Sequence, residues 1–170
     1  TTLVQIFKNY FPDKQIQDEI ARKLDDFEAS MDFTPYPGVL DFILDLKKEG
    51  IKTAIATSSN RPKCSHLKTK CPEFVALFDR ILTAEDFSAS KPDPDCYLKA
   101  AAALGCTKDE CAVFEDAFTG LQAGMASGMI TVGLTTTNSR EAIEGKCHFI
   151  LDSWVGFTTD SLRKLLRSAL

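Results

Sequence analysis

The sequence lacks a long apolar run, and this absence excludes a helix that crosses a bilayer. No apolar stretch approaches the roughly 20 residues that such a helix needs. We see no signal-peptide pattern within these residues. A basic excess is also missing, because 20 Lys and Arg stand against 24 Asp and Glu and the formal net charge is −4. We therefore expect no membrane partner and no nucleic-acid partner, since affinity for nucleic acid rests on basic surfaces.

Paired cysteine motifs are missing as well. The six cysteines form no CxxC pair, and most stand among apolar residues. A disulfide scaffold is unusual in a chain of this size. Zinc needs clustered Cys and His ligands, so Cys64-Ser65-His66 is a poor candidate. We therefore predict free thiols and a cytoplasmic location.

The composition is that of an ordinary globular protein, with 44% apolar and 26% charged residues in 170. Before Pro35, two apolar stripes at helical spacing predict two helices. A helical pair this short cannot bury both of its faces alone. We therefore predict an appendage over residues 1–33, lying on a main domain over residues 34–170.

From Pro35 onward, helix and strand signals alternate. Apolar segments predict strands at 51–56, 78–82, 111–114, 129–134 and 148–151, and amphipathic segments predict helices at 39–48, 62–70, 93–104, 119–127 and 158–170. Such alternation indicates right-handed crossovers and one parallel sheet with helices on both faces. Strands that are apolar throughout agree with this, because parallel strands are buried on both faces. The predicted fold class is α/β and Rossmann-like.

Polar residues follow the predicted strands, at the edge where such sheets gather ligands. Thr57 to Arg61 follow the first strand, Glu115 and Asp116 follow the third, and Lys91 precedes a helix. A hydroxyl beside backbone N–H groups can hold a phosphoryl oxygen, a lysine can neutralise it, and paired carboxylates suit magnesium. Each residue alone is as readily a turn, capping or solvated residue. Together they form a set typical of phosphoryl transfer.

Three segments, and more loosely the C-terminal end, resemble the haloacid dehalogenase superfamily, in its group of beta-phosphoglucomutases and related sugar- or nucleotide-phosphate phosphatases. The three segments are PYPGVLDFILDLKKEGIKTAIATSSN, FDRILTAEDFSASKPDPDCYLKAAAALG and CAVFEDAFTGLQAGMASGMITVGL, and they span about Pro35 to Leu134. The resemblance implies a Mg²⁺-dependent phosphatase or phosphomutase that acts on a small phosphorylated metabolite through an aspartyl-phosphate. A sugar phosphate is the substrate that the likeness suggests, and residues 1–33 resemble the later part of a helical cap.

The resemblance also assigns roles to individual residues. Thr57 matches the hydroxyl that binds the transferring phosphoryl group, and Lys91 matches the cation that balances its charge. Glu115 and Asp116 match the acidic residues of the magnesium site. The residues expected to touch phosphate or substrate are Ser58, Ser59, Asn60 and Arg61.

The family's first motif is absent from these residues. An apolar strand ending in Asp-x-Asp, whose first Asp attacks phosphorus, should precede the cap. Asp93-Pro94-Asp95 opens a predicted helix instead of ending a strand, and Asp152 lacks a second Asp. Three readings stay open: an enzyme whose central strand comes from a missing N-terminal segment or a second chain, a non-catalytic phosphate- or metal-binding relic or regulatory partner, and a purely structural role. Phosphatase and mutase are likewise not distinguished.

The missing strand has a consequence for folding. It would lie in the middle of the sheet, between the strands at 51–56 and 111–114, and unpaired buried backbone groups are costly. We therefore expect the chain by itself to fold poorly. Denaturant unfolding of the purified 170-residue chain checks this, and a cooperative transition in a dilute, verified monomer would contradict it.

Overall fold

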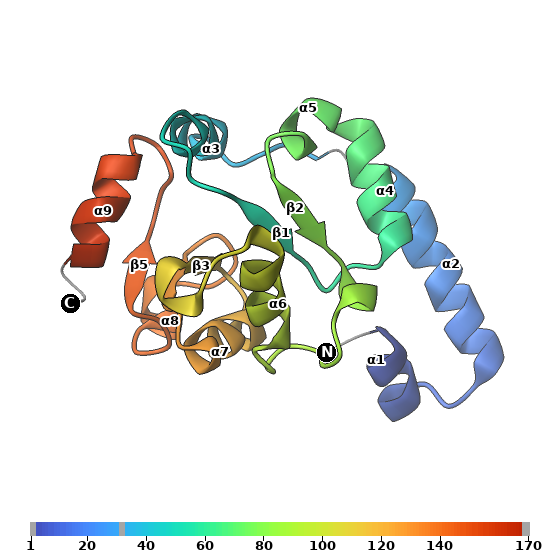
Figure 1. Ribbon diagram of the computed structural model, residues 1–170. Helices are drawn as coiled ribbons and strands as arrows, with labels where there is room; N and C mark the ends of the chain where they lie inside the picture. Colours follow the sequence, from blue (N-terminus) through green and yellow to red (C-terminus); the bar gives the residue numbers. More distant parts are fainter. Residues whose placement is uncertain (1–2, 31–32, 168–170) are drawn as a thin grey trace.

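The computed structural model describes residues 3–30 and 33–167, which form short parallel strands surrounded by helices (Figure 1). The elements in chain order are α1 (Leu3–Tyr10), α2 (Lys14–Ser30), α3 (Val39–Lys48), β1 (Ala54–Ala56), α4 (Arg61–Lys70), α5 (Pro72–Val75), β2 (Arg80–Leu82), the 3-10 helix η1 (Ala84–Asp86), α6 (Asp95–Leu104), the 3-10 helix η2 (Lys108–Glu110), β3 (Ala112–Glu115), α7 (Phe118–Ser127), β4 (Ile130–Leu134), α8 (Arg140–Ile143), β5 (Phe149–Leu151) and α9 (Thr159–Arg167). The predicted α/β class with parallel strands is confirmed.

The strands form two sheets instead of the single sheet that we predicted. β1 pairs with β2 in parallel, with Ile55 opposite Ile81. The second sheet has the order β3-β4-β5 and is also parallel, with Phe114 opposite Val132. Within the described residues, no strand pairing joins β1 to β3. These are the two strands between which the sequence predicts a missing central strand.

Two successive residues of β3 show that helices cover both faces. Val113 belongs to a buried cluster with Tyr97 and Ala101 of α6 and Ala123 of α7. Phe114 instead packs against the buried cluster of α3 and α9. Successive strand side chains point to opposite faces, so β3 lies between two apolar layers.

Helices and aromatic rings connect the sheets where no ladder does. α6 contacts both β1 and β2, and Ala56 packs against the buried cluster that α6 shares with Val113. On the other face, the ring of Phe42 in α3 lies 5.7 Å from that of Phe114 and 5.4 Å from that of Trp154. Side-chain packing therefore sets how the carboxyl ends of β1 and β3 face each other.

The described ends of the predicted helices lie within two residues of those in the structure, and the ends of the predicted strands differ by up to three residues. The first strand begins at Ala54 instead of residue 51, because the Thr53 N–H donates to the side chain of Asp79 (2.8 Å). α6 begins at Asp95 instead of residue 93, and the Asp93 carboxylate accepts from the Asp95 N–H (2.9 Å). The short helices α5, α8, η1 and η2 were not predicted. Residues 1–2, 31–32 and 168–170 of the predicted helical segments lie outside the described residues.

Phe33, which lies between α2 and α3 in the chain, contacts α4 and the residue that follows it. The Phe33 carbonyl accepts from the Cys71 thiol (3.1 Å), and the Phe33 ring lies 6.1 Å from that of His66 in α4. All six cysteines are free thiols, as predicted. Among the described helices, none combines the length and apolar character that crossing a membrane requires.

Gly38 fixes the entry to α3 and yields a stability prediction. Its φ is +87°, and an added Cβ would lie 2.5 Å from the backbone carbon of Trp154. Gly38→Ala should cost about 2–5 kcal/mol, from left-handed backbone strain together with overpacking. Gly50→Ala is the matched control, because Gly50 has φ +69° but nothing within 4 Å. It should cost only about 1–2 kcal/mol. Thermal unfolding followed by circular dichroism measures both, and equal losses would refute the close contact.

Candidate functional site

Of the four principal predicted residues, Lys91 contacts Glu115, and Asp116 is next to Glu115 in the chain. The fourth, Thr57, follows Ala56, which Lys91 also contacts. Lys91 Nζ lies 2.7 Å from Glu115 Oε2, and the carboxylate of Asp116 follows directly. Lys91 Nζ also donates to the carbonyl of Ala56 (3.4 Å), which immediately precedes Thr57. The loop before α6 thus brings its lysine to the carboxyl ends of β1 and β3, where parallel sheets gather ligands.

The Lys91–Glu115 ion pair is largely withdrawn from solvent. Each side chain is 11% exposed. Taking two charges from water is costly, and the cost is offset only when the geometry is good and the other hydrogen-bonding positions are satisfied. The 2.7 Å contact meets the first condition. The surroundings of Glu115 meet the second.

Both oxygens of Glu115 are occupied by donors. Oε2 accepts from Lys91 Nζ and from the hydroxyl of Tyr97 (2.6 Å), and Oε1 accepts from the N–H groups of Asp116 and Ala117 (each 3.0 Å). A Cβ at Gly120 in α7 would lie 2.1 Å from Glu115 Cδ, so the glycine makes room for the carboxylate. Glu115 is therefore held in one orientation.

These contacts set the charge state of the group. Burial acts to raise the pKa of Glu115, but the charge and hydrogen bond of Lys91, with the Tyr97 hydroxyl and the Ala117 N–H, outweigh it and lower the pKa to about 2. Burial, followed by the negative charge of Glu115, raises the pKa of Tyr97 far above its usual range. Tyr97 therefore remains a protonated donor and Glu115 an anion at neutral pH.

Asp116 is held by the segment that follows β4. Its Oδ2 accepts from the hydroxyls of Thr136 (3.0 Å) and Thr137, and its backbone carbonyl accepts from the Asn138 amide (2.7 Å). Among the described residues, no donor reaches Oδ1. One carboxylate oxygen of Asp116 is therefore available to a cation.

The loop after β1 has its own internal bonds. Thr57 Oγ1 accepts from the Ser59 N–H (3.1 Å), which holds the hydroxyl at the turn. The side chain of Asn60 caps α4 by accepting from the Lys63 N–H (3.1 Å). Arg61 forms an ion pair with Asp86 at 3.0 Å. The predicted ligand roles of these residues stay predictions, and the structure gives Asn60 and Arg61 structural partners as well.

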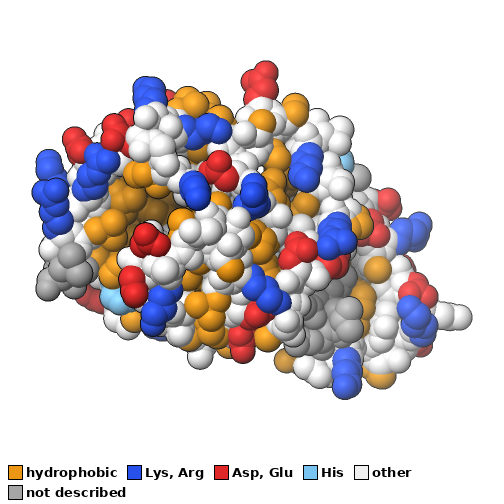
Figure 2. Space-filling view, viewed as in Figure 1, with side chains coloured by type: hydrophobic (Ala, Val, Ile, Leu, Met, Phe, Trp, Pro, Cys, Tyr) orange, Lys and Arg blue, Asp and Glu red, His pale blue; other side chains and the backbone are white. Residues whose placement is uncertain are grey.

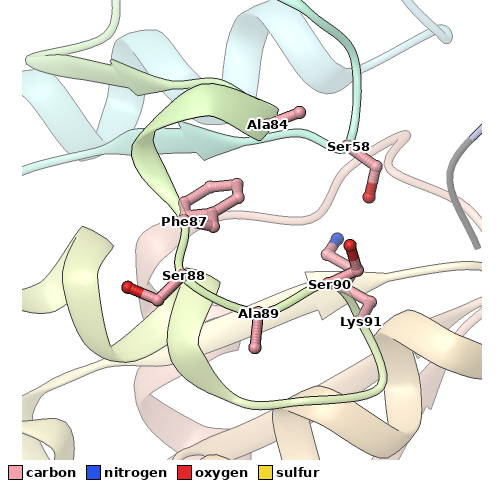
Figure 3. A pocket seen from close by; sticks show the side chains of 7 residues that line it. All are labelled: Ser58, Ala84, Phe87, Ser88, Ala89, Ser90 and Lys91. Carbon is pink, nitrogen blue, oxygen red and sulfur yellow. The ribbon is translucent and has the colours of Figure 1, made fainter. Parts of the chain in front are cut away.

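A small pocket lies beside Lys91. It has a volume of about 70 Å³ and is lined by Ser58, Ala84, Phe87, Ser88, Ala89, Ser90 and Lys91. In Figure 3 the hydroxyls of Ser58 and Ser90 and the amine of Lys91 lie on one side of the space, and the Ser88 hydroxyl points away. Ser88 instead accepts from Lys99 (2.7 Å). The pocket thus offers hydroxyls and one cation to a ligand.

The carboxylates here do not form a complete metal site. Within residues 3–30 and 33–167, no three His, Cys, Asp or Glu side chains gather in a way that would hold a metal. The occupied oxygens of Glu115 leave it little capacity as a direct ligand. Asp116 does suit Mg²⁺, which prefers carboxylate oxygens and keeps several waters.

Tyr97 and the threonines that hold Asp116 were not predicted from the sequence. A signal for the threonines was available, because Thr135-Thr136-Thr137-Asn138 follow a predicted strand just as Thr57 and Glu115 do. Tyr97 carries no comparable signal, since a tyrosine on a helix is usually a packing residue. Its hydroxyl contacts Glu115 because α6 packs beside β3, a tertiary contact that the sequence does not show.

Comparison with known proteins gives one family. Residues 1–143 match the family model described as haloacid dehalogenase-like hydrolase. The chain is 34% identical over 140 residues to the protein SUPPRESSOR OF QUENCHING 1, chloroplastic, of Arabidopsis thaliana, which covers 82% of this chain and 13% of that protein. It is 38% identical over 99 residues to the beta-phosphoglucomutase of Bacillus subtilis (strain 168), which covers 58% of this chain and 42% of the relative. The chain spans less than half the length of either relative.

A solved structure gives the same fold. A HAD hydrolase, family IA, variant 3 from Entamoeba histolytica superposes with a TM-score of 0.80 at 23% identity, covering 91% of this chain and 73% of the other. At this identity the likeness concerns the fold alone.

The charge state of Glu115 predicts how stability responds to acid. Because the pKa is lowered from 4.5 to about 2 on folding, its contribution is fully present above pH 4.5 and is lost as the pH falls toward 2. The loss should be on the order of 3 kcal/mol. Glu115→Gln should be less stable at pH 7, because Lys91 is left buried without its counterion, and should lack this acid-dependent loss.

Urea unfolding between pH 2 and pH 7 measures the effect. The exposed Glu73→Gln serves as the control and should follow the native protein at every pH. An acid response in Glu115→Gln equal to that of the native protein would show that another carboxylate carries it.

Proposed function

Because this chain belongs to the haloacid dehalogenase-like hydrolase family, we propose that it carries the phosphate-binding part of a phosphatase or phosphomutase. The single observation that supports this most is the largely buried ammonium of Lys91, held by Glu115 at the carboxyl ends of two parallel strands. Such a group is not an ordinary solvated surface lysine. It does suit a phosphoryl group, whose charge must be balanced as it transfers.

We propose that Thr57 and Lys91 share the transferring phosphoryl group. The Thr57 hydroxyl, placed after β1, donates to one oxygen, and the Lys91 ammonium compensates the negative charge of the others. Ser58 lines the adjoining pocket and Ser59 follows it in the same loop, which favours a supporting role for them. Asn60 and Arg61 would touch the substrate only by exchanging their present partners.

We propose Mg²⁺ as the cofactor, with Asp116 as its ligand from this chain. The free Oδ1 of Asp116 supports that role, while the occupied oxygens of Glu115 favour an indirect one. A bound Mg²⁺ would supply positive charge to the phosphate oxygens. The chain's own contribution is to orient Asp116 through Thr136, Thr137 and Asn138.

The nucleophilic aspartate, on this proposal, comes from residues outside these 170, in the same polypeptide or in a second chain. β1 pairs with β2 and β3 pairs with β4, but no ladder joins β1 to β3 among the described residues, so the second edge of each offers backbone groups to an inserted strand. Figure 2 shows a hollow lined by hydrophobic side chains on the side of the molecule where α3 and α9 lie, which is compatible with an apolar occupant.

We propose a small phosphorylated metabolite, represented by a sugar phosphate, as the substrate class, because one relative is a beta-phosphoglucomutase. Figure 2 shows acidic and basic side chains interspersed on one face, which suits a small ligand better than nucleic acid. Residues 1–33 would belong to a cap over the site. Six free thiols favour a reducing compartment such as the cytoplasm.

A second candidate function is a non-catalytic phosphate-binding or regulatory protein. The observation in its favour is that Glu115, matched by resemblance to a metal ligand, is fully engaged with Lys91 and Tyr97. The two candidates differ in turnover: both bind phosphate through Lys91, but only the enzyme hydrolyses a phosphate ester when the complete polypeptide is present.

Substitution of Lys91 tests the proposal. In the protein at its natural length, Lys91→Ala should lower magnesium-dependent kcat/KM for p-nitrophenyl phosphate about 100- to 1000-fold, as expected for a lost transition-state charge partner. The exposed Lys70→Ala is the control and should not change it. The 170-residue chain by itself should give negligible turnover.

Two outcomes would contradict this. Repurified 170-residue chain with substantial turnover that depends on Lys91 would show that the nucleophile lies within it. Full-length protein that binds inorganic phosphate but hydrolyses no ester would favour the non-catalytic candidate.

A further inference from the structure

Tyr97 is a buried polar residue that the phosphate-binding roles above do not use. It lies in the first turn of α6, six positions after Lys91, and is 7% exposed. Its ring belongs to the buried cluster with Ala101 and Val113, so its position is fixed by packing. A buried tyrosine normally directs its hydroxyl to a partner, and this one directs it to the active-site carboxylate.

The ring and the hydroxyl of Tyr97 act on the same ion pair from two sides. The hydroxyl donates to Glu115 Oε2 at 2.6 Å, the oxygen that also accepts from Lys91. The ring centre lies 4.8 Å from Lys91 Nζ, within the range of a cation–π contact. Tyr97 thus fixes the acceptor and also forms one wall against the ammonium.

Because Tyr97 holds Glu115 and one side of Lys91, it limits where the N–H donors of Lys91 can point. A lysine ammonium carries three N–H donors. Among the described residues, Glu115 Oε2 and the Ala56 carbonyl are its acceptors, so one donor remains. With the Tyr97 ring closing one side, the remaining donor is restricted in direction. The pocket of Ser58 and Ser90 is lined by Lys91 and lies beside it.

We propose that Tyr97 is a positioning residue for Lys91, acting through Glu115 to direct the free donor of the ammonium at an anionic oxygen of the ligand. This inference rests on the proposed function, because it takes phosphate as the ligand of Lys91. It extends that function to a residue outside the four principal ones. Without the hydroxyl, Glu115 Oε2 keeps only one partner, and both charged side chains gain freedom.

Tyr97→Phe isolates the hydroxyl, since the ring and its packing are retained. Binding of inorganic phosphate to the natural-length protein is measured by isothermal titration calorimetry, with magnesium chloride present throughout. We expect the Kd for phosphate to rise about three- to tenfold in Tyr97→Phe, the range of a lost hydrogen bond near a charge. Tyr36→Phe is the matched control, because Tyr36 is 57% exposed, and its Kd should not change.

The calorimetric stoichiometry separates positioning from folding. A merely structural Tyr97 would lower the fraction of sites that bind and leave the Kd unchanged, which would overturn the inference. Glu115→Gln is a second variant that keeps the side-chain volume but removes the attraction for Lys91, and its Kd should also rise. An unchanged Kd in Glu115→Gln would likewise overturn the inference.

Lys91→Ala in the same titration distinguishes a failure of the positioning role of Tyr97 from a failure of the proposed phosphate site. If Lys91→Ala weakens phosphate binding and Tyr97→Phe does not, the positioning role is wrong and the phosphate site stands. If Lys91→Ala binds phosphate as the native protein does, or the native protein does not bind it, the proposed function is wrong and the inference fails with it.

Discussion

The contact between Lys91 and Glu115 is the interaction on which the rest of the site depends. Lys91 comes from the loop before α6, Glu115 ends β3, and the same ammonium reaches the last carbonyl of β1. Because no ladder joins β1 to β3 within the described residues, these two contacts of the Lys91 ammonium form a polar link between the two sheets. α6, which carries Tyr97 and packs on both sheets, adds an apolar link. Lys91, Glu115 and Tyr97 therefore set the charges of the site and also help to hold the two sheets together.

Much of the fold follows from local patterns that tertiary contacts do not override. Continuous apolar runs mark the strands because parallel strands are buried on both faces. Gly105 and Gly128 mark helix ends because both have the left-handed φ that a helix terminus uses. The rule that polar residues after parallel strands lie together also led to Thr57, Glu115 and Asp116, whereas Lys91 was predicted from its place before a helix. Applied to the segment after β4, it would have led to Thr136 and Thr137.

The sequence does not predict which of several adjacent polar residues form structural contacts and which keep a free atom for a ligand. Asn60 and Arg61 stand where ligand contacts are expected, yet one caps α4 and the other pairs with Asp86. Glu115 and Asp116 are adjacent and chemically alike, but only Asp116 retains a free oxygen. The ion pair of Arg61 and the contacts that Lys91 and Tyr97 make with Glu115 depend on distances of a few ångströms between segments far apart in the chain. The cap formed by Asn60, in contrast, needs only the N–H three residues later, so its partner is always within reach.

The missing side chain of Gly120 has a consequence for which acids the site can hold. A Cβ there would occupy the space now filled by the end of the Glu115 side chain. The side chains at positions 115 and 120 therefore occupy one small volume, so a larger side chain at one position requires a smaller one at the other. A chain of this design with alanine at the helix position would accommodate the shorter aspartate after its strand more readily than glutamate. The residue at helix position 120 therefore determines how long an acidic side chain position 115 can hold.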